Sequence, residues 1–207
     1  MLADWIRRGA ERRLGGHGGP TGDLYFANAC GDALASGAVQ RLSPTVFASE
    51  SAVLVLRHGA GLDVGALAQD KTLVWLIDDD IEAGIADPAL SRLHRTKLML
   101  CERAFARGFG KRLDHVVVSS LQLEGMAKRL APEAAITVLD PYWSEPFPDL
   151  GHFDEAPDGI EIGCLGAATH KADLALVWDA FAGLLSRHDK LSVWVSANHR
   201  PPAALTK

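Results

Sequence analysis

The sequence has few cysteines and no long apolar run, and both absences narrow the class of protein. Three cysteines stand far apart in 207 residues and form no CxxC pair, so we expect neither a zinc site nor a disulfide framework. The longest apolar runs, such as residues 73–77, are only as long as a strand, so we expect no transmembrane span. Free thiols are typical of a reducing compartment, which predicts a cytoplasmic protein.

The fingerprints of several enzyme classes are also missing. The chain has no G-x-S-x-G, H-E-x-x-H, Walker A or G-x-G-x-x-G sequence, so it offers no standard motif of a hydrolase, an ATPase or a dinucleotide-binding enzyme. Positive charge is not in excess either. The formal net charge is −5 at pH 7, and we therefore expect no nucleic-acid partner.

Short apolar stretches alternate with helical patterns along the chain. A first strand is predicted at residues 24–29 and the best helix at residues 92–109, with Leu93, Cys101 and Phe105 on its apolar face. Buried strands are predicted at residues 52–56 (AVLVL), 72–77 (TLVWLI), 115–118 (HVVV) and 136–139 (ITVL). This alternation predicts an α/β fold in which helices cover both faces of a Rossmann-like parallel sheet.

Composition divides the chain into four predicted segments. These are an N-terminal helix with a glycine-rich linker (residues 1–20), a Rossmann-like domain (21–145), a linker rich in Pro, Asp and Gly (146–159) and the start of a second α/β unit (160–207). The second unit is predicted to be one strand–helix–strand unit, at residues 160–165, 173–187 and 191–195.

The predicted first helix, residues 2–14, has two interpretations. Trp5 and Ile6 lie on one side of it, with four arginines around them. Such a helix either binds a membrane surface, which would place the protein at the inner face of the membrane, or docks on the protein itself. Because no apolar segment follows the arginines, we do not expect a signal peptide.

The residues that directly follow each strand are the candidate site residues, because ligands of parallel sheets bind beyond the carboxyl ends of the strands. They are Arg57-His58-Gly59, Asp78-Asp79-Asp80, Ser119-Ser120, Asp140, Gly166 to Lys171 and Ser196 to His199.

The small-residue loop from Gly166 to Lys171 (GAATHK) follows a predicted strand and precedes a helix. Its backbone N–H groups can approach an anion closely, while Thr169 adds a hydroxyl donor and Lys171 a positive charge for a diphosphate. The same sequence also suits a tight turn in which Asp173 caps or charges the first helical turn.

The three consecutive aspartates, Asp78 to Asp80, allow three interpretations. Two of them could bind Mg²⁺ or Mn²⁺ together with a diphosphate. One could act as a general base, and we name Asp78 and His58 as the acid/base candidates. Alternatively, one aspartate caps the next helix and the others face solvent.

The sequence Arg57-His58-Gly59 after a strand matches the nucleophile motif of the histidine phosphatases, in which a histidine accepts the phosphoryl group. Those enzymes carry the motif near the start of the chain and need further arginines, whereas residues 60–70 contain no Arg or Lys. A histidine phosphatase is therefore an alternative function.

Three stretches resemble, in the same order, the two-domain GT-B glycosyltransferases. They are AVLVLR followed by TLVWLIDDDIEAG, then LDHVVVSSLQLEGMAKRL followed by ITVLDPYW, and finally IEIGCLGAATHKADLALVWDAFAGLLSRHDKLSVWV. The third stretch is similar to the opening of the family's donor domain and is the most specific of the three. The resemblance covers about residues 50–196.

The resemblance implies transfer of a sugar from a nucleotide-sugar donor to an acceptor, with no bound metal or other cofactor. Gly166, Thr169, His170 and Lys171 match the donor-domain loop that faces the diphosphate. The positions that would line the cleft are Arg57, Asp79, Asp80, Ser119 and Asp140.

The resemblance also implies an incomplete donor domain, because residues 160–207 match only its opening part. A single strand–helix–strand unit can hardly bury both faces of its sheet. We therefore expect it to pack on the first domain, on a second copy, on a partner chain or on sequence beyond this chain. A non-catalytic partner subunit of the same fold is accordingly another alternative function.

Overall fold

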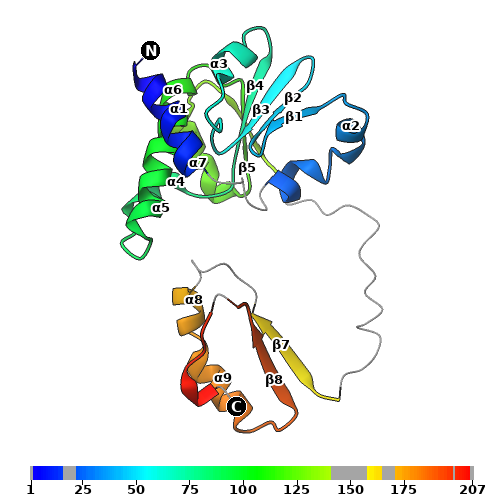
Figure 1. Cartoon of the computed structure of the whole chain (residues 1–207), viewed down its shortest axis with the longest axis vertical. Helices are drawn as coiled ribbons and strands as arrows, with labels where there is room; N and C mark the ends of the chain where they lie inside the picture. Colours follow the sequence, from blue (N-terminus) through cyan, green and yellow to red (C-terminus); the bar gives the residue numbers. More distant parts are fainter. Residues whose placement is uncertain (1, 16–21, 141–157, 165–170, 198, 206–207) are drawn as a thin grey trace. The chain divides into compact units, whose positions relative to one another are not determined.

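The computed structural model describes residues 2–15, 22–140, 158–164, 171–197 and 199–205. The chain divides into two compact units, Met1–Pro146 and Phe147–Lys207, each of which is described by itself (Figure 1). Both units combine helices with parallel strands, so the predicted α/β class is confirmed.

The first unit is built on a six-stranded sheet with the spatial order β1-β2-β3-β4-β5-β6. The strands are β1 Gln40–Ser43, β2 Val46–Ala48, β3 Ala52–Leu56, β4 Thr72–Ile77, β5 His115–Val118 and β6 Ala135–Val138. The pairs β1–β2 and β2–β3 are antiparallel, whereas β3 to β6 are parallel to one another. This mostly parallel sheet with flanking helices is Rossmann-like.

The helices that connect the parallel strands pack on one face of the sheet. They are α3 Val64–Leu67, α4 Ile81–Ala86, α5 Arg92–Lys97, η2 Leu98–Arg103, α6 Ala104–Phe109 and α7 Leu121–Leu130. The parallel strands β3 to β6 lie next to one another in the sheet in the same order as in the chain. Because crossovers between parallel strands are right-handed, this order places the connecting helices on the same face of the sheet. The main core lies on this side, where Trp75, Phe105 and Met126 are at most 1% exposed.

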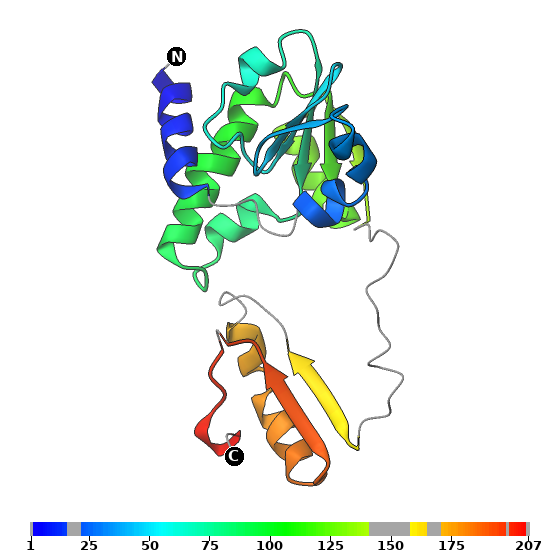
Figure 2. The ribbon, with the colours of Figure 1, turned by 45° about the vertical axis from the view of Figure 1, so that its right-hand side comes forward.

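The opposite face of the sheet also carries helices, so the prediction of a sheet flanked by helices is confirmed. Among the described residues, the cover of this face comes from η1 Asp23–Ala27 and α2 Gly31–Ala35 (Figure 2). The strand predicted at residues 24–29 is wrong, because η1 is a π-helix. Its Phe26 packs on Phe47 of β2, with ring centroids 4.8 Å apart.

The predicted helix at residues 92–109 is present as the continuous stretch α5–η2–α6. Its apolar face differs from the prediction, since Leu93 is 67% exposed. The buried side chains are those of Leu98, Cys101, Glu102, Phe105 and Ala106. The middle part, η2, is a π-helix, in which the wider turn brings both Cys101 and Glu102 into the interior.

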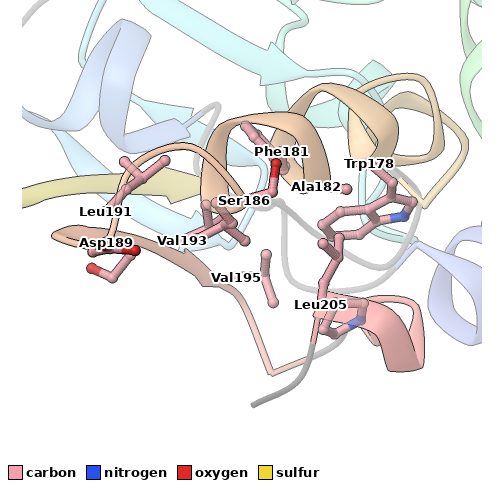
Figure 3. A pocket seen from close by; sticks show the side chains of 12 residues that line it. Trp178, Phe181, Ala182, Ser186, Asp189, Leu191, Val193, Val195 and Leu205 are labelled. Atoms are coloured by element: carbon pink, nitrogen blue, oxygen red, sulfur yellow. The ribbon is translucent and has the colours of Figure 1, made fainter.

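The second unit is the predicted strand–helix–strand unit. Strands β7 Ile160–Cys164 and β8 Leu191–Val195 are parallel, and α8 Lys171–Ala175 and α9 Trp178–Leu185 lie between them in the chain. A short 3-10 helix follows at Ala203–Leu205. Apolar side chains of α9 and β8 line an open pocket of about 540 Å³, among them Trp178, Phe181 and Val193 (Figure 3).

Candidate functional site

The carboxyl ends of β3, β4 and β5 lie side by side at one edge of the first sheet. Leu56 pairs with Leu76, and Ile77 pairs with Val118, so the residues that follow these strands are neighbours. Ligands of parallel sheets bind at this edge. In many parallel sheets the strand order reverses and opens a crevice in which the ligand binds. The order of the described strands does not reverse, so the candidate site here consists of the loops that follow the strands.

Arg57, the first residue after β3, is the centre of this edge. Its guanidinium group lies 2.7 Å from Asp79 Oδ2, 3.4 Å from Asp78 Oδ1 and 3.1 Å from Glu102 Oε1. Burial disfavours the charged guanidinium, but the attraction of Glu102, Asp79 and Asp78 outweighs it, so the pKa of Arg57 is raised. Arg57 is therefore a permanent cation that holds three carboxyl groups together.

The backbone of Arg57 is strained. Its φ of 63° lies in the left-handed region, as does that of Ala60 at 52°. Hydrogen bonds hold the strained residue on both sides: its N–H donates to Leu76 O at 2.9 Å, and Trp75 Nε1 donates to its carbonyl oxygen at 3.1 Å. Strained backbone of this kind persists where the surroundings enforce it, and it is concentrated at functional sites.

Glu102 belongs to the site although we did not predict it from the sequence. It comes from η2, is 1% exposed and lies among the buried apolar side chains of the helix. Burial raises the pKa of Glu102, and the attraction of Arg57 opposes the rise. The available signal was an acidic residue that interrupts an apolar helical face, four residues after Leu98 and three before Phe105.

The three aspartates after β4 have different surroundings. Asp80 is the N-cap of α4, and its carboxylate accepts a hydrogen bond from Ala83 N at 2.9 Å. The side chain of Asp78 is 18% exposed, whereas that of Asp79 is 56% exposed. Ser119, after β5, donates from Oγ to the backbone oxygen of Asp78 at 3.3 Å. Asp79 is thus the carboxylate of the cluster that a ligand reaches most easily.

His58 lies next to Arg57 in the chain but is directed into the interior. Its ring is 1% exposed, Nε2 donates to Gly15 O at 3.0 Å, and Nδ1 accepts from Ala60 N at 3.2 Å. Burial, together with the nearby cations Lys97, Arg57 and Arg7, lowers the pKa of His58 to about 4. In this arrangement the ring is neutral at pH 7 and both nitrogens are occupied within the protein.

The structure describes only some of the other predicted site residues. Asp140 follows β6 at the same edge of the sheet and is exposed. Gly166, Thr169 and His170 lie outside the described residues, and Lys171 is the first residue of α8. His199, after β8, is 6% exposed, and neither ring nitrogen has a hydrogen-bond partner among the described residues.

The described residues hold neither a candidate metal site nor a membrane-spanning helix. They contain no group of three or more His, Cys, Asp or Glu side chains arranged to hold a metal ion. No helix in this part of the chain is long and apolar enough to cross a membrane. All three cysteines are free thiols.

Comparisons of the chain with protein-family models, with curated proteins and with solved structures found no match. The functional assignment therefore depends on the geometry of the strand-end cluster and on the sequence of the loop before α8.

Proposed function

We propose that the protein is a glycosyltransferase-like protein that binds a nucleotide sugar and transfers the sugar to an acceptor. The observation that carries the proposal is the exposed carboxylate of Asp79, held by Arg57 at the carboxyl edge of a Rossmann-like sheet. The resemblance of residues 160–195 to the opening of a donor domain supports the choice of sugar transfer over other chemistry.

In this proposal Asp78 and Asp79 act on the acceptor. Glycosyl transfer to a hydroxyl group requires that the hydroxyl lose its proton while the bond between the sugar and the diphosphate breaks. A carboxylate at the mouth of the site can take that proton. The ion pair with Arg57 holds this carboxylate in one place, and Glu102 in turn anchors Arg57 from the interior.

The donor diphosphate is assigned to the second unit. Gly166, Thr169, His170 and Lys171 supply backbone N–H groups, a hydroxyl group and a positive charge, which suit a departing diphosphate. Because these groups would neutralise the leaving group, the proposal requires no metal ion. We place the reaction in the cytoplasm, in keeping with three free thiols.

A non-catalytic partner subunit of the same fold remains the main alternative. The histidine phosphatase alternative has less support from the geometry, because a phosphoryl group cannot reach a ring that is 1% exposed and hydrogen-bonded at both nitrogens. We retain His58 as a residue that stabilises the strand-end loop.

Calorimetric titration with uridine, guanosine, adenosine and thymidine diphosphates tests the donor site. We expect one of the four to bind the wild type, and Lys171→Ala to weaken that binding by about tenfold, since it removes a charge-assisted contact. Lys190→Ala is the matched control, because Lys190 is an exposed lysine of the same unit that forms an ion pair with Asp158. Equal affinity in all three proteins, or no binding of any diphosphate, would contradict the proposed donor site.

A further inference from the structure

The N-terminal helix α1, Leu2–Leu14, docks on the first unit through charged side chains rather than apolar ones. Arg7 and Glu11 are 4% and 2% exposed, and they form an ion pair one helical turn apart. The Arg7 guanidinium lies over the rings of Phe105 and Phe109, 5.6 and 5.2 Å from their centroids. Glu11 accepts a hydrogen bond from Gly61 N at 2.8 Å. The docking helix anticipated as one interpretation of residues 2–14 is therefore present.

The opposite face of α1 is open, and it carries two large exposed apolar side chains. Trp5 is 70% exposed and Ile6 is 50% exposed. One to two turns further on, Gly9, Arg12 and Arg13 are exposed at the spacing that keeps them on the same side. A Cβ atom added at Gly9 would meet no atom within 4 Å. We call this surface, made of Trp5, Ile6, Gly9, Arg12 and Arg13, the outer face of α1.

The arginines of the outer face lack the ion pairs that Arg7 and Arg8 form. Arg8, on the flank, forms ion pairs with Asp4 and Asp63. Arg12 takes part in docking by donating to the backbone oxygen of Gly61 at 3.2 Å, but this partner carries no charge. Within the described residues, no carboxylate forms an ion pair with Arg12 or Arg13. The outer face therefore combines exposed apolar side chains with two positive charges that no described carboxylate pairs with.

We propose that the outer face of α1 binds the surface of an anionic lipid bilayer. Trp5 and Ile6 would enter the boundary between headgroups and acyl chains, where an amphipathic indole ring is favoured. The positive charges of Arg12 and Arg13 would attract the lipid phosphates, which supply a negative charge that no described carboxylate supplies to these two residues. This complementarity of charge selects an anionic membrane over an uncharged apolar partner.

The docking contacts connect this surface to the strand-end cluster. Glu11 and Arg12 both bind Gly61, and Gly15 accepts the hydrogen bond from His58. Gly61 and His58 belong to the loop that begins with Arg57. Membrane binding through α1 would therefore hold the candidate site close to the bilayer, although the proposal does not depend on the function assigned to that site.

Co-sedimentation of the full chain with vesicles tests the proposal. The vesicles are either pure phosphatidylcholine or phosphatidylcholine mixed with phosphatidylglycerol. We expect binding to the anionic vesicles only, and we expect about 0.5 M NaCl to abolish most of it, since salt at this concentration screens surface charges. Equal binding to both kinds of vesicle, or no binding to either, would overturn the proposal.

Two double variants locate the binding surface. Trp5→Ala/Arg13→Glu alters the outer face, and reversing one charge alone should weaken binding by more than about tenfold, at roughly fivefold per unit of charge. Leu121→Ala/Arg129→Glu is the matched control, because Leu121 is 71% exposed and Arg129 is exposed on α7. Circular dichroism establishes that both variants are folded. Unchanged vesicle binding of the first variant, or an equal loss in the control, would overturn the proposal.

Sedimentation equilibrium without lipid distinguishes a protein partner. If the outer face joins two copies of this chain, the wild type dimerises and Trp5→Ala/Arg13→Glu does not. That result would assign the outer face to self-association and would overturn the membrane proposal. A monomeric wild type that binds anionic vesicles supports it.

Discussion

Removal of the Arg57 side chain tests whether the Arg57–Glu102 pair organises the strand-end cluster. Glu102 is 1% exposed in the wild type, and Arg57→Ala removes the cation that lies 3.1 Å from its Oε1. Loss of one partner of a buried ion pair costs about 3–5 kcal/mol of the free energy of unfolding. At neutral pH we therefore expect Arg57→Ala to unfold at a much lower urea concentration than the wild type.

The dependence on pH separates this electrostatic cost from lost packing. Burial raises the pKa of Glu102 and Arg57 opposes the rise, so in Arg57→Ala the pKa of Glu102 is higher still. A carboxyl group whose pKa is higher in the folded state than in the unfolded state adds to the free energy of unfolding at low pH. This contribution is complete below the pKa of the unfolded state and is lost as pH rises through the pKa of the folded state. The cost of Arg57→Ala is therefore smallest at acidic pH and grows as pH increases, whereas a packing loss does not change.

The assay is urea unfolding followed by near-ultraviolet circular dichroism at several pH values. The double variant Arg57→Ala/Glu102→Gln removes the stranded charge and keeps the shape of the glutamate. Relative to Arg57→Ala, we expect it to recover at least about 1 kcal/mol at neutral pH, because no unpaired carboxylate is left buried. A cost of Arg57→Ala below about 1 kcal/mol, or one that is the same at all pH values, would refute the reasoning.

Three further predictions concern stability. The pKa of His58 is lowered from 6.5 to about 4, so the free energy of unfolding of the wild type should fall by roughly 3 kcal/mol as pH falls through this range. His58→Gln should lose less over the same range. Equal losses in the two proteins would count against a buried neutral ring. Asp80→Ala should cost about 1 kcal/mol in urea unfolding through the lost N-cap, while the same change at the exposed Asp79, which is not the N-cap, costs less. Gly110→Ala should destabilise the protein by more than about 2 kcal/mol, because its Cβ would clash with the backbone oxygen of Leu130, while Gly125→Ala in α7 should be neutral or stabilising in thermal melts.

The central strands were predictable because they are buried within the sheet. Ala52–Leu56, Thr72–Ile77 and His115–Val118 have the bounds that their apolar runs predict. The antiparallel strands β1 and β2 were missed, since QRLS is mostly exposed and VFA has only three residues, so neither shows a readable period. The segment at residues 24–29 was misassigned because Tyr25 and Phe26 favour strands, whereas their packing on Phe47 is made from a π-helix.

The candidate site was predictable in position but not in its contacts. Strand ends in a parallel sheet indicate where Arg57, Asp78 and Asp79 lie, whatever their side chains do. The role of Glu102 depends on a partner 45 positions earlier in the chain, and sequence spacing carries no information about that pairing. Likewise, nothing local distinguishes His58, which is directed inward, from Arg57 beside it.

The most direct test of the proposed function is a turnover assay with a panel of nucleotide sugars, in which release of the nucleoside diphosphate is measured with and without candidate acceptors. We predict that the wild type releases the diphosphate from one member of the panel. Asp79→Asn, which keeps the size of the side chain but cannot accept the proton, should reduce the rate by on the order of a hundredfold. A folded wild-type protein that releases no diphosphate from any nucleotide sugar, or an Asp79→Asn variant with the full rate, would contradict the account.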